Sequence, residues 1–226
     1  IEPMVKRRTD IHYPKPKVVS VTQATELGTV YSVRELEAIG EKCRSLGLRL
    51  HMDGARFPNA LATLGVAPKD ISWKIGVDVL CLGGTKNGSS VGEAVVFFKR
   101  ELAHEFDYRC KQAGQLASKM RFLSAPWVGM LEKGAWLRHA AHSNAMARKL
   151  EAGLRALPQI QVMFPCQANS VFVKMPTSVA DKLHERGWRF YTFIGEGGCR
   201  LMCSWDIQEA DVEAFVADAR DAAAKL

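Results

Sequence analysis

Residues 77–90 read VDVLCLGGTKNGSS, an apolar run that stops at two glycines and is followed almost at once by Lys86. A continuous apolar run of this kind is typical of a strand that is covered on both faces of a sheet. The chain before it carries two further strand patterns, KVVSV (17–21) and LRLHM (48–52), with helical patterns between them. Strands that alternate with helices predict a parallel or mixed α/β sheet with crossover helices.

The helical patterns between these strands have clear start and stop signals. Ser32 and Glu35 have the spacing of a capping box, so a helix is expected to begin at Val33 and to end before Gly47. The stretch ARFPNALATLG (55–65) predicts a short helix closed by its last glycine, and GEAVVFF (92–98) predicts one more strand. The buried side of the first helix is expected to carry Val33, Leu36, Ile39 and Leu46.

After residue 100 long helical patterns replace the alternation. Residues 111–155 predict two helices, of which the second is long. The remainder predicts strands at 169–175, 188–193 and 199–205, a helix at 177–187 and an amphipathic terminal helix at 207–226. We therefore expect a large domain over residues 1–130 and a small carboxyl-terminal α/β domain over 131–226, linked by a long helix at about 130–155.

The composition excludes several classes of protein. None of the apolar stretches approaches the roughly 18 residues that a membrane span needs, and the first residues lack the apolar core of a secretory signal. The six cysteines are scattered without the spacing of a zinc site, which favours reduced thiols and no metal centre. We expect a soluble, cytoplasmic protein that does not bind a membrane.

The formal net charge of +7 raises the question of nucleic-acid binding. The dense basic cluster is confined to residues 6–8, and elsewhere Lys and Arg alternate with acidic residues, as on a solvated face. No nucleic-acid partner is therefore expected. A basic balance also suits an enzyme with an anionic cofactor or substrate.

Two side chains that could take part in catalysis or cofactor binding follow predicted strands. Asp53 comes after the strand 48–52, and Lys86 comes after the apolar run that ends at Gly83 and Gly84. Ligands of open α/β sheets bind at the carboxyl ends of the strands, so both residues would face one crevice. A lysine amine can form a Schiff base, and a carboxylate can keep a pyridine nitrogen protonated. This pair suits pyridoxal phosphate.

Residues next to Lys86 also fit pyridoxal phosphate binding, but Lys86 and Asp53 have a structural alternative as well. The glycines would let backbone approach the cofactor closely, and Thr85 would hydrogen-bond its phosphate. In the alternative, Lys86 is a loop lysine with its amine in water, and Asp53 caps the helix 55–65. His51 is expected to face away from Asp53 and to be structural, on the argument that neighbours on a strand point to opposite faces.

Five stretches carry a wider resemblance. They are VTQATELGTVYS (21–32), LHMDGARFPNAL (50–61), LCLGGTKNGSSVGEAVVF (80–97), KQAGQLASKMRFLSAPW (111–127) and RLMCSWD (200–206). Together they resemble the low-specificity L-threonine aldolases of the beta-eliminating lyase group, in order and at about the family's spacing, from about residue 15 to the end. HMDGAR with GGTKNG downstream is the specific joint signal.

The resemblance implies the type I fold of pyridoxal phosphate enzymes, also called aspartate-aminotransferase-like. It also implies an activity, the cleavage of L-threonine, L-allo-threonine and other β-hydroxy-α-amino acids to glycine and an aldehyde. A homodimer or homotetramer with active sites at its interfaces is the implied assembly.

Roles for individual residues are likewise implied by the resemblance. Lys86 would hold the cofactor as a Schiff base, Asp53 would pair with its pyridine nitrogen, and Arg56 would reach its phenolic oxygen or the substrate carboxylate. Arg200 would clamp the substrate carboxylate in the bidentate way that a guanidinium allows. Lys111 and Arg121 would bind the cofactor phosphate of a neighbouring subunit.

Each of these cations also has a purely structural alternative. Arg56 would begin a helix, and Arg200 would pair on the surface with Glu196 or Asp206. Lys111 and Arg121 would be solvated charges on helices.

The amino-terminal motifs of that family are not visible in IEPMVKRRTDIHYPKP (1–16). They include a phosphate-binding turn at a helix start, a side chain that stacks on the ring, and a histidine thought to act as the base. The chain thus resembles the carboxyl-terminal two thirds of such an enzyme. Three alternatives stay open: β-elimination or transamination on the same fold, a truncated chain without catalysis, and a basic nucleic-acid-binding protein.

Overall fold

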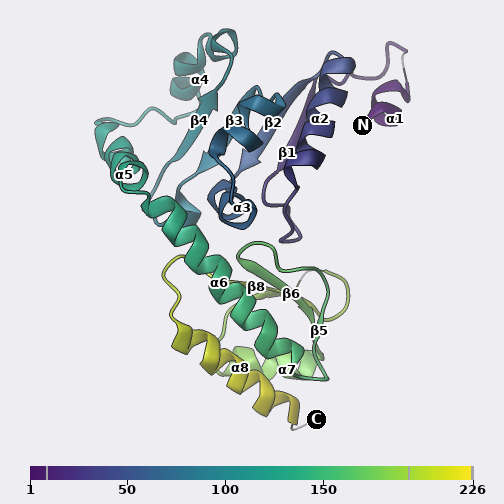
Figure 1. The fold of residues 1–226 in the computed structure, drawn as a ribbon, viewed down its shortest axis with the longest axis vertical. Coiled ribbons are helices and arrows are strands. Elements are labelled where there is room, and N and C mark those ends of the chain that lie inside the picture. The colour runs from purple at the N-terminus through teal and green to yellow at the C-terminus, as the bar shows by residue number, and fades with distance from the viewer. Residues whose placement is uncertain (9, 193, 225–226) are drawn as a thin grey trace. The chain divides into compact units, whose positions relative to one another are not determined.

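The computed structural model describes residues 1–8, 10–192 and 194–224, and the chain divides into two compact units (Figure 1). Unit 1 comprises residues 1–23, 31–57 and 64–135, and unit 2 comprises 24–30, 58–63 and 136–226. Two short segments from the first third of the chain therefore belong to the carboxyl-terminal unit. The domain limits expected from the sequence, 1–130 and 131–226, stay a prediction.

Unit 1 is built on a four-stranded sheet in the order β1-β2-β3-β4. Its strands are β1 (Val18–Thr22), β2 (Arg49–Gly54), β3 (Val79–Gly83) and β4 (Glu93–Phe97). Strands β1, β2 and β3 are parallel, and β4 runs antiparallel to β3. The mixed, mostly parallel α/β sheet predicted from the alternation of strands and helices is confirmed.

Helix α2 (Val33–Ser45) begins as its capping box predicts. The Ser32 hydroxyl accepts a hydrogen bond from the Glu35 backbone N–H at 3.2 Å, and the Glu35 carboxylate accepts one from the Ser32 N–H at 2.8 Å. These bonds satisfy amide groups that the first turn of a helix leaves without partners. Leu36 on the inner side of α2 is fully buried, and the helix contacts β2.

Short helices complete unit 1, and most of them were not predicted. They are α1 (Glu2–Lys6), α4 (Phe106–Gln112), α5 (Arg121–Glu132) and the 3-10 turns η1 (Pro68–Ile71), η2 (Trp73–Ile75), η3 (Thr85–Asn87) and η4 (Arg100–Ala103). Helix α3 (Phe57–Leu64), predicted from the stretch 55–65, has residues in both units. Turns of three or four residues are too short to leave a periodic hydrophobic signal.

The burial pattern of β2 contradicts one expectation about His51. Leu50 and Met52 point to the buried face of the sheet, whereas His51 and Asp53 are only partly buried on the other. Residues two apart on a strand share a face, so His51 lies on the same face as Asp53. The prediction that His51 faces away from Asp53 was therefore wrong.

Asp78, just before β3, is a buried carboxylate that links β2 to the residue Lys99 after β4. Its side chain is 5% exposed and accepts hydrogen bonds from the Leu50 N–H at 2.8 Å and from Lys99 Nζ at 2.6 Å. The Arg49 guanidinium lies 3.4 Å away. Burial favours the neutral acid, but the bonds from Lys99 and Leu50 hold the pKa of Asp78 below its usual value.

Replacing Asp78 by alanine is expected to lower the free energy of unfolding by about 2–4 kcal/mol, because the Leu50 amide loses its acceptor and two cations lose their partner. Since the folded pKa is lowered, the stabilisation is present above the unfolded pKa and is lost as the pH falls through the folded one. Urea denaturation at pH 7 and at a series of pH values below about 4 measures both effects, because the ordinary pKa of an aspartate lies near that value.

The matched control for Asp78 is Asp70→Ala, which removes a carboxylate that is 30% exposed, pairs with Lys74 and accepts the Ala67 N–H. It is expected to cost much less, since ion pairs that stay in contact with water contribute little. Equal losses in the two variants would contradict the assigned role of Asp78.

Unit 2 contains a second, antiparallel sheet in the order β5-β6-β8-β7. Its strands are β5 (Gln161–Val162), β6 (Ser170–Lys174), β7 (Tyr191–Thr192) and β8 (Gly198–Met202), and its helices are α6 (Ala135–Arg155), α7 (Thr177–Glu185) and α8 (Glu209–Ala224). The strand predicted at 188–193 is limited to residues 191–192, while residue 193, like 225–226, lies outside the described residues. One hydrophobic core, with Leu154, Val171, Val173 and Leu201, unites the sheet and the helices.

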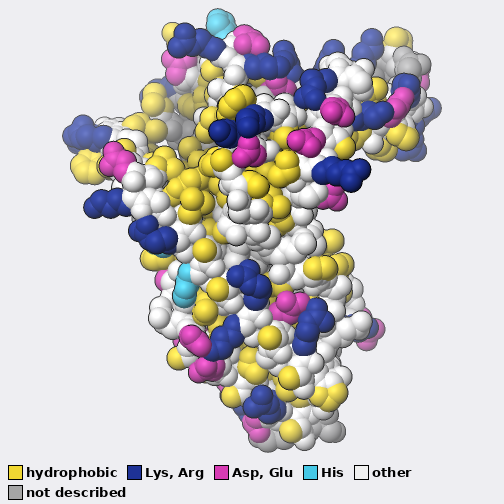
Figure 2. Space-filling model, viewed as in Figure 1, with side chains coloured by type: hydrophobic (Ala, Val, Ile, Leu, Met, Phe, Trp, Pro, Cys, Tyr) yellow, Lys and Arg dark blue, Asp and Glu magenta, His cyan; other side chains and the backbone are white. Residues whose placement is uncertain are grey.

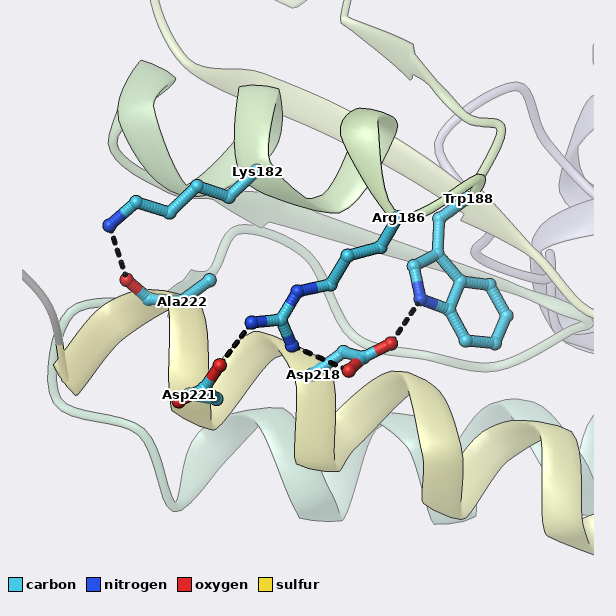
Figure 3. Close-up of polar contacts among 6 residues, drawn as sticks. All are labelled: Lys182, Arg186, Trp188, Asp218, Asp221 and Ala222. Carbon is cyan, nitrogen blue, oxygen red and sulfur yellow. Dashed lines mark hydrogen bonds and ion pairs between the residues drawn. The ribbon is translucent and has the colours of Figure 1, made fainter.

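A polar clasp joins α7 to α8 (Figure 3). Arg186 pairs with Asp221 and, at 2.6 Å, with Asp218, whose second oxygen accepts a hydrogen bond from Trp188 Nε1 at 2.8 Å. The bond from Trp188, and then that from Arg186, lowers the pKa of Asp218. The clasp is therefore intact at neutral pH and weakens as the pH falls through that lowered value.

A buried polar network holds residues 58–63 in unit 2. The Asn59 side-chain amide donates to Asn144 Oδ1 at 2.9 Å and to Ser143 Oγ at 3.0 Å. In return, the Asn144 amide donates to the Asn59 carbonyl at 2.9 Å and to Thr63 Oγ1 at 3.0 Å. Each amide group has partners, as buried polar groups require.

Asn144→Leu is expected to lower the free energy of unfolding by about 2–4 kcal/mol, because the buried Asn59 side chain loses one acceptor and the Asn59 carbonyl loses the Asn144 donor. Thermal or urea denaturation measures the loss. Arg148→Ala, on the same helix but exposed, is the control and is expected to change stability within about 0.5 kcal/mol. A loss no larger than that of the control would show that the network contributes nothing.

The surface matches the interspersed charges of the sequence. On the face seen in Figure 2, Lys and Arg side chains alternate with Asp and Glu side chains. Among the described residues, no helix combines the length and apolar character needed to cross a bilayer.

Candidate active site

The site begins at two neighbouring parallel strands of unit 1. In the register of β2 and β3, Asp53 lies opposite Cys81 and Gly54 lies opposite Leu82. Asp53 is the next-to-last residue of β2, and Lys86 lies in η3, directly after β3. The structure thus places both predicted residues at the carboxyl ends of adjacent strands, where open α/β sheets bind their ligands.

Glycines let these two strand ends touch. A Cβ on Gly83 would lie 2.5 Å from the Ala55 carbonyl oxygen, and a Cβ on Gly54 would lie 2.8 Å from that of Cys81. On Gly84 it would lie 2.6 Å from the Trp127 ring. All three separations are shorter than any normal carbon contact, so only glycine fits. The segments DGA and GGTK are therefore in direct contact.

The Asp53 carboxylate is held by a local turn. Its Oδ1 accepts a hydrogen bond from the Ala55 N–H at 2.9 Å, and the Asp53 carbonyl accepts one from the Gln23 N–H at 2.9 Å. An Asp that bonds the backbone two residues on is typical of a strand that turns into a loop. The carboxylate is fixed at the strand end and is partly exposed.

A row of polar side chains crosses the sheet on the Asp53 face. The Ser20 hydroxyl lies 2.8 Å from His51 Nδ1, and His51 Nε2 lies 3.3 Å from Cys81 Sγ. Burial, and then the charges of Asp53 and Glu93, raise the pKa of the Cys81 thiol. The thiol therefore stays protonated at neutral pH, which makes it a poor nucleophile although an imidazole lies beside it.

Lys86 occupies an exposed position in a short, internally bonded turn. The Gly84 carbonyl accepts hydrogen bonds from the N–H groups of Asn87 at 2.9 Å and Ser89 at 3.1 Å. The Glu93 carboxylate accepts hydrogen bonds from the N–H groups of Gly84 and Thr85, both at 3.2 Å. Thr85, predicted at the cofactor phosphate, thus has its amide beside a carboxylate. Sequence reasoning did not select Glu93, because its position opposite Gly83 follows from the pairing of β4 with β3 in the folded chain.

The predicted cations lie in several elements. Arg56 is partly buried between β2 and α3, three residues after Asp53. Lys111 is exposed in α4, and the exposed Arg121 begins α5 with its guanidinium 5.4 Å from the Phe122 ring centre. These two cations follow β4 and do not belong to the loops after β2 and β3.

Arg200 lies in β8 of unit 2, partly buried, with its guanidinium 5.6 Å from the ring centre of Tyr191. A cation over the face of an aromatic ring is attracted by the ring's negative charge density.

Potential metal ligands do not cluster in the part of the chain that the structure describes. Over residues 1–8, 10–192 and 194–224, no group of three His, Cys, Asp or Glu side chains could hold a metal ion. The six cysteines are all free thiols.

Comparison with known proteins extends these observations. Residues 1–178 match the beta-eliminating lyase family. The chain is 61% identical over 220 residues to the low specificity L-threonine aldolase of a Pseudomonas species, a match that covers 97% of this chain and 64% of that protein. The enzyme of the same name from Pseudomonas aeruginosa is 60% identical over 221 residues, covering 98% of this chain and 63% of the relative.

A solved structure agrees in fold. The threonine aldolase of Leishmania major superposes with a TM-score of 0.89 at 30% identity, over 98% of this chain and 66% of that one. The chain thus spans slightly less than two thirds of the length of each of these proteins. The expected fold is confirmed.

The match to the family covers well over half of the chain and includes both strand ends that carry Asp53 and Lys86. The chain belongs to the beta-eliminating lyase family.

Proposed function

We propose that this chain carries the cofactor-binding core of an aldolase that cleaves L-threonine, L-allo-threonine and other β-hydroxy-α-amino acids to glycine and an aldehyde. The observation that carries the proposal is the placement of Asp53 and Lys86 on adjoining parallel strand ends. The Pseudomonas relatives, 61% and 60% identical, are named low specificity L-threonine aldolases, which supports the proposal.

Family membership implies pyridoxal phosphate as the cofactor. The residues at the strand ends fit this group, because a fixed carboxylate and an exposed amine follow adjacent strands whose glycines bring the backbones together. When bound, pyridoxal phosphate supplies an electron sink for the bond that breaks next to the amino group.

The individual roles are part of the proposal. Lys86 would bind the cofactor aldehyde through its amine, and Asp53 would hold the proton on the ring nitrogen. Arg56 would contact the phenolic oxygen or the substrate carboxylate, and Arg200 would bind that carboxylate through two parallel hydrogen bonds. Thr85, through its hydroxyl, and Lys111 and Arg121, from a neighbouring subunit, would contact the phosphate.

The cleavage itself is balanced without a further reactant. The Cα–Cβ bond of threonine breaks, the β-hydroxyl loses its proton as acetaldehyde forms, and Cα gains a proton to give glycine. The role of Asp53 is to keep positive charge at the ring nitrogen, where electron density arrives. The base that takes the hydroxyl proton has no assigned residue in this chain.

The assembly and location are proposed as a homodimer or homotetramer in the cytoplasm. Exposed apolar side chains on and beside α5 support self-association, because such side chains gathered on a surface mark interaction sites. They are Leu116 (49% exposed), Met120 (41%), Phe122 (69%), Val128 (52%) and Leu131 (44%).

The test is a product analysis with the purified chain, added pyridoxal phosphate and L-threonine. Aldol cleavage is expected to give acetaldehyde and glycine in equal amounts. Formation of 2-oxobutanoate and ammonia would instead assign β-elimination, and a keto acid formed without ammonia would assign transamination. If none of these products forms while the protein binds the cofactor, the aldolase assignment fails for this chain.

A further inference from the structure

The turn that carries Lys86 is tied to the neighbouring strand by one side chain. Glu93 is the first residue of β4, and its carboxylate divides its two oxygens between two amides: Oε2 accepts from Gly84 and Oε1 from Thr85, each at 3.2 Å. The backbone of Glu93 is itself held by its pairing with Gly83 of β3. The carboxylate therefore links β4 to the two residues that directly precede Lys86.

The Glu93 carboxylate supplies acceptors for backbone N–H groups that would otherwise have none in this turn. A 3-10 turn leaves its first amides without carbonyl partners inside the turn, and η3 is only three residues long. Its cap residue, Gly84, has no side chain that could accept a hydrogen bond, so the acceptor has to come from elsewhere. A carboxylate is favoured there because hydrogen bonds from N–H groups to a charged acceptor are stronger than those to a neutral one.

We propose that Glu93 is the positioning residue for Lys86: by accepting the Gly84 and Thr85 amides, it fixes the turn in the orientation from which the lysine amine reaches the cofactor aldehyde. This inference rests on the proposed function of Lys86. It also leaves the phosphate to groups other than these two amides, since the Glu93 carboxylate already accepts their hydrogen bonds.

Amide hydrogen exchange in the chain without cofactor tests the contact. In Glu93→Ala the Gly84 and Thr85 amides lose their acceptor, and their exchange is expected to accelerate about tenfold, the equivalent of one hydrogen bond to a charged group. Protection of the β2 and β3 amides is expected to stay unchanged, because the pairing of these strands does not involve the Glu93 side chain.

Covalent capture of the cofactor tests the consequence for Lys86. The chain is incubated with pyridoxal phosphate, reduced with borohydride and mapped by peptide mass, with label at the exposed Lys69 as the internal standard. The label at Lys86 relative to Lys69 is expected to fall about tenfold in Glu93→Ala. Glu93→Gln keeps the shape and one acceptor oxygen, so it is expected to fall between the alanine variant and the parent.

The matched control is Glu101→Ala, which removes an exposed carboxylate from η4 in the same unit. It is expected to change neither exchange at Gly84 and Thr85 nor the label at Lys86.

The outcomes separate the two levels of the proposal. Unchanged labelling of Lys86 in Glu93→Ala, with normal labelling in the parent, would overturn the role of Glu93 alone. Absence of label at Lys86 in the parent would overturn the proposed function of Lys86 and this inference with it. Faster exchange throughout β2 and β3 in both Glu93 variants would make Glu93 a general stabiliser and overturn a role specific to Lys86.

Discussion

Lys86→Ala is expected to abolish the visible absorption band of bound pyridoxal phosphate and to lower cleavage of L-threonine at least about a thousandfold. Alanine has no amine with which to hold the cofactor aldehyde, and η3 offers no other lysine, since its remaining residues are Thr85 and Asn87. Because Lys86 is exposed, the substitution leaves the core intact. The measurement is an absorption titration with pyridoxal phosphate, paired with an acetaldehyde assay.

Lys69→Ala is the control for Lys86, since Lys69 is an exposed lysine of η1 in the same unit. It is expected to keep the band and the rate of the parent. A Lys86→Ala protein that cleaves threonine at the parental rate would show that Lys86 is a loop lysine, as the structural alternative holds.

Asp53→Asn is expected to slow cleavage about a hundredfold to a thousandfold while the protein still binds the cofactor. The amide is nearly the same size as the carboxylate and keeps an oxygen for the Ala55 N–H, so the turn after β2 is preserved. It lacks the negative charge that holds a proton on the ring nitrogen, so electron density is accepted less well there. Stopped-time assays of glycine formation, together with a cofactor-binding titration, measure the two effects separately.

Ser20→Ala serves as the control for Asp53, because Ser20 lies on the same face of the sheet but contacts His51. Its loss is expected to change the rate by less than about threefold, in line with the loss of one partly exposed neutral hydrogen bond. If Asp53→Asn behaved like Ser20→Ala, Asp53 would be a capping residue without a part in the chemistry.

Local signals in the sequence predicted the four strands of unit 1 and helices α2 and α3. The capping box at Ser32 and Glu35 forms between residues three apart, so its bonds could be read from spacing alone. The continuous apolar run that becomes β3 likewise needs no knowledge of its partners. Lys86 was identified because it follows this run after two glycines and Thr85, and Asp53 because it directly follows the strand pattern LRLHM.

Other features depend on contacts between distant residues. A strand was expected at 188–193 because WRFYTF has the composition of a strand, whereas the described residues of this stretch that pair with β8 are Tyr191 and Thr192. The error over His51 was one of counting along the strand, since residues 51 and 53 are two apart and share a face.

The sequence by itself determined the alternation of strands and helices, the capped start of α2, the family resemblance and the two residues at the strand ends. The resemblance rests on its sequence motifs, whereas the other features follow from short-range chemistry: side-chain periodicity and hydrogen bonds between near neighbours. Only the tertiary structure decided that Glu93 meets the Gly84 and Thr85 amides and that Asn59 bonds Asn144, 85 residues away. The reason is that periodicity determines which face of a helix or strand is buried, whereas strand register and packing determine which distant residue contacts that face.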